Sequence, residues 1–225
     1  MNRFLIALSV VVFAHSLSAE TVADVLSRMD ASAPKFHGMS ADITMVTFTS
    51  VINDTTSEKG TMEMQKLSPK DVRAVIKLQT EGSNDQRVLA FKGSGVRIYS
   101  AANNTYQDYD IGKKGLLNQY LLLGFGSSGK ELSESYKISL VGSETVAGSK
   151  TSKLQMIPKD PEVLQHLSSV EVWIPENEAD PIQQKFYEPS GNYRQVTYEH
   201  VQLNPSFGKG SLDFKLPAGA RRQQQ

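Results

Sequence analysis

The chain of 225 residues contains no cysteine. Disulfide bonds, thiolate metal sites and a cysteine nucleophile are therefore excluded, and so is a lipid-modified cysteine that would anchor the protein to a membrane. Stability must come from burial of apolar side chains, and we expect a soluble protein without a membrane anchor.

Histidine is also scarce, and neither sign of charge is in excess. The sequence has 4 His, 24 Lys plus Arg and 24 Asp plus Glu, so it gives no electrostatic reason to expect nucleic acid as a partner. The histidines lack metal-pair spacing, no Gly-x-Ser-x-Gly turn is present, and the glycine-rich stretch 124–129 lacks the Lys-Ser or Lys-Thr of a phosphate loop. We therefore expect no enzyme activity, no metal site and no cofactor.

Long apolar runs are confined to the N-terminus. Arg3 precedes an apolar run over residues 4–14, and small residues follow at Ser16, Ser18 and Ala19, which is typical of a signal peptide. The run is too short to span a bilayer, and no later stretch approaches that length. We predict a signal peptide over residues 1–19, a single domain over residues 20–225, and a periplasmic location.

The exported chain should open with an amphipathic helix. Apolar residues recur at helical spacing between positions 22 and 29, and Thr21 with Asp24 resembles a capping box. Pro34 should end the helix. Its apolar face must lie against another part of the molecule.

From residue 38 the apolar pattern changes to that of strands. Val72, Ala74, Ile76 and Leu78 alternate with other residues, which predicts a half-buried strand. Apolar residues on both faces of the first strand predict a bulge or a switch of the buried face near Met45. The predicted strands cover residues 39–48, 57–66, 72–79, 86–92, 96–100, 105–109, 136–144, 150–158, 169–174, 182–188 and 193–203, with a short helix over 160–167. About eleven antiparallel strands are more than a flat open sheet holds without curling.

A leucine-rich segment interrupts the strands between residues 110 and 132. Helical spacing relates Leu116, Leu117, Tyr120, Leu121 and Leu123. Glycines follow at positions 124, 126 and 129, and they would weaken a permanently packed helix. They therefore favour a movable lid, including Phe125, over an apolar cavity. The alternative is a helix packed permanently in an ordinary core.

Large apolar side chains on the strands are the candidates for the wall of such a cavity. They are Phe91, Ile98, Trp173, Phe186, Val196 and Tyr198. Each of them could equally fill an ordinary core, because the apolar face of a strand does not reveal what covers it.

Four short motifs follow one another along the chain. They are Lys-Leu-Ser-Pro-Lys-Asp-Val-Arg at 66–73, Leu-Gln-Met-Ile-Pro-Lys at 154–159, Val-Glu-Val-Trp-Ile at 170–174 and Phe-Lys-Leu-Pro-Ala-Gly at 214–219. With the signal peptide, the N-terminal helix and the leucine-rich insertion, they resemble the LolA family of periplasmic outer-membrane lipoprotein carriers. The resemblance covers essentially all of the exported chain.

The resemblance implies a mainly β fold with an α lid, in which an incomplete antiparallel β-barrel encloses an apolar cavity. That cavity would carry the acyl chains of lipoproteins from the inner to the outer membrane. The implied partners are acylated lipoproteins, an inner-membrane ABC transporter and an outer-membrane acceptor, and we expect a monomer. Arg73, four residues after Pro69, matches the family's lid latch, although strand alternation places Arg73 opposite the apolar row of Val72 and Ala74.

The alternative function is a periplasmic regulatory domain of the same half-barrel type, which senses a lipid or a protein without transporting it. A membrane-anchored receptor would need a lipid-accepting cysteine. A lipid-modifying enzyme would need a nucleophile or metal site, for which the sequence has no signal.

Overall fold

The computed structural model describes residues 20–68, 71–110 and 123–223. The predicted signal peptide and most of the predicted lid, including Leu116, Leu117, Tyr120 and Leu121, lie outside these residues. The helices are α1 (Val22–Ser32), η1 (Ala33–Lys35), α3 (Gly129–Ser135) and α4 (Pro161–Leu164). The strands are β1 (Gly38–Thr49), β2 (Asp54–Ser68), β3 (Asp71–Thr80), β4 (Gln86–Lys92), β5 (Gly95–Ser100), β6 (Thr105–Asp110), β7 (Tyr136–Val146), β8 (Ser149–Pro158), β9 (Ser169–Pro175), β10 (Gln183–Tyr187), β11 (Tyr193–Leu203) and β12 (Arg221–Arg222).

Helix α1 begins and ends as its sequence predicts. Thr21 is the N-cap, and its backbone N–H donates to the Asp24 carboxylate at 2.9 Å, which completes a capping box. The helix stops at Ser32, just before the short η1 helix that contains Pro34. Val25 and Met29 on its apolar face are buried, whereas Val22 and Leu26 are partly buried.

All the strands of the described residues form one sheet in the order β12-β6-β5-β4-β3-β2-β1-β11-β10-β9-β8-β7. Neighbouring strands are antiparallel, except that β12 runs parallel to β6. The end strands β12 and β7 are not paired with each other, so the sheet is open. The predicted mainly β, incomplete antiparallel barrel with an N-terminal helix is confirmed.

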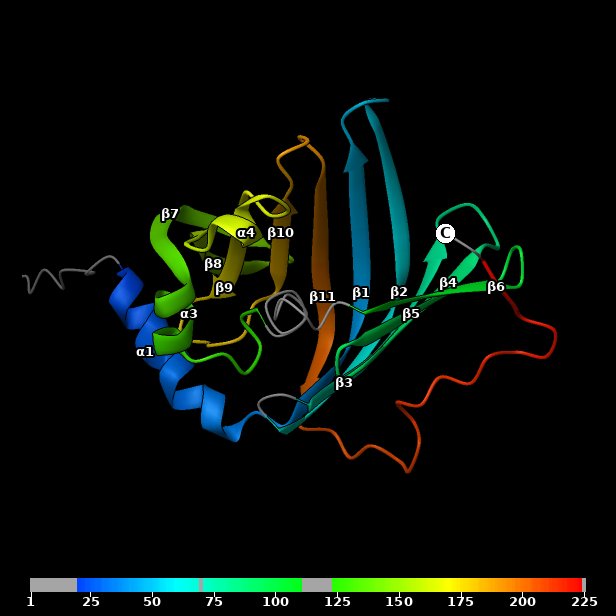
Figure 1. The fold of residues 1–225 in the computed structure, drawn as a ribbon. Helices are drawn as coiled ribbons and strands as arrows, with labels where there is room; N and C mark the ends of the chain where they lie inside the picture. Colours follow the sequence, from blue (N-terminus) through cyan, green and yellow to red (C-terminus); the bar gives the residue numbers. More distant parts are fainter. Residues whose placement is uncertain (1–19, 69–70, 111–122, 224–225) are drawn as a thin grey trace, which may run out of the picture.

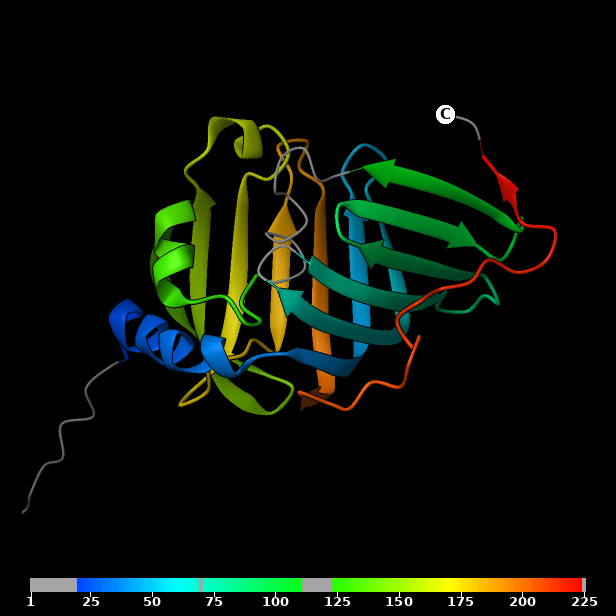
Figure 2. The same cartoon turned by 60° about the horizontal axis from the view of Figure 1, so that its bottom comes forward.

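The sheet is curved, and its two halves have different surroundings. Strands β7–β10 and β3–β6 lie on opposite sides of the central strands β11, β1 and β2 (Figure 1). Figure 2 shows β3–β6 running across the direction of β7–β11.

Helices α1, α3 and α4 lie beside β7–β10, which we call the covered wall. No helix of the described residues lies beside β3–β6, which we call the open wall. The face between the walls is the concave face, and the other is the convex face.

The C-terminal segment after β11 runs along the convex face of the open wall. Leu212 is buried, and the ring of Phe214 lies 5.6 Å from that of Tyr99. Strand β12 then pairs with the outer edge of β6. The prediction of about eleven strands lacks this twelfth one, because two consecutive arginines have no alternating pattern.

The predicted bulge near Met45 is wrong. The register between β1 and β11 shifts between Ser40 and Asp42 instead. Apolar residues occur on both faces of β1 because Phe48 lies on the convex face, where its ring stacks on that of Tyr193 with 5.1 Å between centroids.

Candidate functional site

Apolar side chains cover the concave face of the central strands and the open wall. The strand register places them in rows that run across the sheet. One row consists of Ala41, Met62, Ile76, Leu89 and Ile98, from five successive strands. These residues belong to one apolar cluster, so the concave face is a continuous apolar surface.

A second apolar cluster joins the covered wall to its helices. Val25 from α1, Leu132 from α3 and Val163 from α4 pack with strand residues such as Leu154 and Val170. All five are buried. On this wall the concave face is the interior of a packed core.

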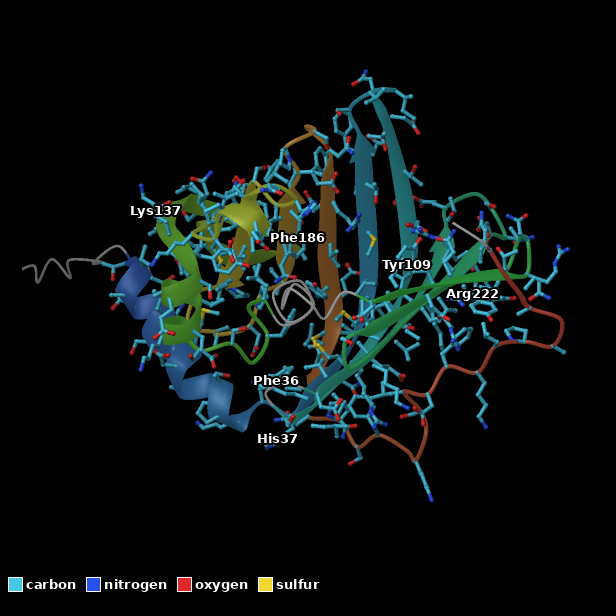
Figure 3. All side chains as sticks on the ribbon, in the orientation of Figure 1. Phe36, His37, Tyr109, Lys137, Phe186 and Arg222 are labelled. Carbon is cyan, nitrogen blue, oxygen red and sulfur yellow. The ribbon has the colours of Figure 1, made fainter. Side chains whose placement is uncertain are left out.

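The concave face of the open wall is buried on β3 but less buried on β4 to β6. Leu89, Phe91, Ile98 and Tyr109 are only partly buried, although they pack against the first cluster. Figure 3 shows Tyr109 on the open wall and Phe186 on the covered wall. Partly exposed apolar side chains of this kind form a candidate surface for an apolar ligand.

The described end of the predicted lid, residues 123–126, links the two clusters. Leu123 belongs to the second cluster and Phe125 to the first, and both are buried. The Gln184 amide donates to the carbonyl oxygen of Leu123, and the Tyr198 hydroxyl donates to the Gln184 side-chain oxygen at 2.6 Å. Burial raises the pKa of Tyr198 well above its usual value, which keeps this hydroxyl protonated as a donor.

A lysine fixes the end of the same segment. Lys66 on β2 donates from Nζ to the carbonyl oxygen of Gly126 at 3.0 Å. The ring of Phe125 lies edge-on to that of Tyr198, with 4.9 Å between centroids. Residues 123–126 are therefore held on the concave face by both backbone and side-chain contacts.

The glycines predicted as joints of the lid pack closely against other parts of the molecule. A Cβ at Gly126 would lie 2.2 Å from the Phe36 ring, and one at Gly129 would lie 2.4 Å from the carbonyl oxygen of Leu26. Ser128 forms a capping box with Glu131 and begins α3. These glycines permit close packing, which is a structural reason for their presence.

Five of the six predicted wall residues lie on the concave face. Phe91 and Ile98 lie on the open wall, Val196 and Tyr198 on the central strand β11, and Phe186 on the covered wall. They do not form one patch, because Phe186 belongs to the core beneath the helices whereas Phe91 and Ile98 belong to the open wall.

Trp173 does not line the concave face, and that prediction is wrong. Val172 and Ile174 point into the second cluster, so Trp173 between them points to the convex face. There its indole N–H donates to Glu144 at 2.9 Å, and Lys153 lies 4.8 Å from the ring. Hydrogen bonds from Trp173 and Lys153 lower the pKa of Glu144 below its usual value.

Arg73 also lies on the convex face, so its prediction as a cavity-facing lid latch is wrong. Its neighbours Val72 and Ala74 belong to the concave cluster. The Arg73 guanidinium instead lies 3.8 Å from the carboxylate of Asp213 in the C-terminal segment. Strand alternation holds without the bulge that a concave position would require.

Two polar residues that hold the described end of the predicted lid, Lys66 and Gln184, were not predicted from the sequence. Lys66 is in phase with Met62 and Met64 on β2, and Gln184 is in phase with Phe186 on β10. A polar residue in phase with an apolar row was the signal that could have identified both.

The described residues contain no cluster of candidate metal ligands, that is, no group of three or more His, Cys, Asp or Glu side chains that could hold a metal ion. None of their helices is both long and apolar enough to cross a membrane. What the described face offers a ligand is mainly apolar contact.

The comparison with known proteins finds structures of similar fold but no similar sequence. No protein-family model matches the chain, and no curated protein is significantly similar to it in sequence. The structure of an uncharacterized conserved protein from Thermus thermophilus has a TM-score of 0.50 and 11% identity, covering 90% of this chain and 98% of that one. At this identity the likeness concerns the fold alone.

Two further neighbours are more distant in structure. The Mycobacterium tuberculosis lipoprotein LppX has a TM-score of 0.49 and 14% identity, covering 82% of this chain and 98% of its own. The LolA superfamily protein NE2245 from Nitrosomonas europaea has a TM-score of 0.40 and 12% identity, covering 85% and 97%. The second of these two structures is the one that carries the LolA superfamily name.

Proposed function

We propose that the concave face binds acyl chains and that the protein is a periplasmic carrier for the lipid anchors of lipoproteins. The observation that carries this proposal is the open wall, where partly buried apolar side chains continue the buried apolar surface of the central strands. Each methylene group that a ligand buries there contributes about 0.8 kcal/mol. An acyl chain could therefore bind through apolar contact alone.

The proposed carrier performs no catalytic step. Export through the signal peptide at residues 1–19 would place it in the periplasm, and the resemblance to the LolA family supports a route from the inner to the outer membrane. An inner-membrane ABC transporter would load the carrier, and an outer-membrane acceptor would unload it. These partners are part of the proposal.

Neighbouring residues on β4 provide a matched test. Leu89 pairs with Ile98 on the concave face, whereas Val88 pairs with Tyr99 on the convex face. Leu89→Asp should weaken binding of a fluorescent fatty-acid probe about tenfold or more, because it places a charge among apolar side chains. Val88→Asp should leave the affinity within about twofold of the unchanged protein. Equal effects of the two substitutions would contradict the proposed site.

Native mass spectrometry of the purified protein tests what it carries. Co-purified lipoproteins or acylated peptides would support the carrier. A protein that holds no acyl chain but binds a protein partner tightly would favour the regulatory domain instead.

A further inference from the structure

One ion pair, between Glu58 on β2 and Arg87 on β4, interrupts the apolar concave face. Arg87 is in phase with Leu89 and Phe91 on β4, and Glu58 is in phase with Met62 on β2. Both charged side chains therefore point toward the concave face, at the border of its apolar surface.

The two partners differ in exposure, although they form one bidentate pair. Arg87 donates from Nε to Glu58 Oε1 at 2.9 Å, and it donates from Nη2 to the other carboxylate oxygen. The side chain of Glu58 is 4% exposed, whereas that of Arg87 is 39% exposed. The carboxylate thus lies beneath the guanidinium, and among the described residues Nη1 of Arg87 has no hydrogen-bond partner.

This arrangement determines which polar group a bound lipid can place beside Arg87. The buried carboxylate already balances the charge of the guanidinium, so the outer N–H groups can donate without carrying an unbalanced positive charge. A neutral ester or amide carbonyl accepts such hydrogen bonds. A free carboxylate or a phosphate would bring a second anion to the same guanidinium, close to the desolvated Glu58.

We infer that the Glu58–Arg87 pair makes the site selective for acyl chains held in neutral ester or amide linkage, against fatty-acid anions. This inference rests on the proposed acyl-chain binding. It assigns Arg87 as the donor to the linkage, and Glu58 as the residue that makes the pair neutral overall and so excludes anions.

The protein offers a control pair of the same geometry. Arg97 donates to both oxygens of Asp108, at 2.7 and 3.1 Å, with side chains 38% and 34% exposed. Arg97 lies between Val96 and Ile98 of the concave cluster, so this pair is on the convex face. Asp108→Asn removes the acid of a bidentate pair without changing the concave face.

The test compares two probes on the exported, delipidated protein at pH 7.5: a dansyl-labelled undecanoic acid and its methyl ester. The unchanged protein should bind the ester more tightly than the acid. Glu58→Gln leaves the guanidinium unbalanced and should lower the ester-to-acid affinity ratio about tenfold, mainly by tighter binding of the acid. Asp108→Asn should leave the ratio unchanged.

Arg87→Lys provides a second test, because lysine keeps the positive charge beside Glu58. It removes the outer donor of the guanidinium and should weaken ester binding severalfold, with little change for the acid. If the unchanged protein bound both probes but Glu58→Gln left the ratio unaltered, or Asp108→Asn altered it equally, the inference would be overturned while acyl binding stood. If the unchanged protein bound neither probe, the proposed function would fall, and the inference with it.

Discussion

The covered wall and the open wall are buried from opposite sides. Helices α1, α3 and α4 pack on the concave face of the covered wall, while its convex face carries the polar contacts around Trp173. On the open wall the C-terminal segment lies on the convex face, where Val75 is 3% exposed and Leu212 is buried. The open wall therefore has packing behind it, and its concave face can remain partly exposed to a ligand.

The largest expected effect compares matched truncations on the two walls. Leu154→Ala on the covered wall should lower the free energy of unfolding by about 2–5 kcal/mol, because Leu154 is 1% exposed and leaves a cavity. Ile98→Ala on the open wall should cost about 1 kcal/mol, because the side chain is only partly buried. Urea unfolding measures both. Equal losses would show that the open wall is an ordinary core.

Leu212→Ala separates the stability of the open wall from its ligand binding. Removing this buried side chain should lower the free energy of unfolding by about 2 kcal/mol. The affinity for a fluorescent fatty-acid probe should stay within about twofold, because Leu212 lies on the convex face. A large loss of affinity in a folded variant would contradict the division between the two faces.

The smallest effect concerns a carboxyl group beside the covered wall. Burial, together with the nearby Glu178 carboxylate, raises the pKa of Asp180 to about 6 from an ordinary value of 3.8. Because the folded pKa is the higher one, the stabilisation is complete below about pH 4 and is lost as pH rises through 6. Asp180→Asn should remove this part of the pH dependence, about 1 kcal/mol or less, since the group is partly exposed. Thermal melts of both proteins between pH 4 and 7 would reveal it, and parallel curves would refute it.

Much of the fold could be predicted from the sequence, because the alternation of apolar residues and the positions of turn residues are local patterns. The ranges 86–92 and 193–203 agree with β4 and β11 at both ends. Helix α3 was missed, although Ser128 and Glu131 carry the capping-box pattern, because the glycines beside them were interpreted as joints. The packing role of Gly126 and Gly129 depends on residues distant in the sequence, so no local pattern could reveal it.

The candidate site was harder to predict than the fold. Alternation alone places Trp173 and Arg73 on the convex face. The large ring of Trp173 favoured the concave face for that residue, and the family resemblance favoured it for Arg73. No sequence pattern distinguishes Phe186 from Ile98, because both are apolar strand residues. Only the placement of the helices and of the C-terminal segment decides which of them lies in a packed core.

The pairing of β1 with β11 has a consequence for how the chain folds. Hairpins within β2–β6 and within β7–β10 can form from neighbouring residues, but the register of Ser40 with Gln202 joins distant parts of the sequence. Closing so long a loop is slow, and it requires nearly the whole chain. Until then Ile43 and Met45 are exposed along the free edge of a strand, where chains aggregate or recruit a chaperone. The rate of this one closure, rather than the stability of either wall, sets how long an unfolded chain is vulnerable.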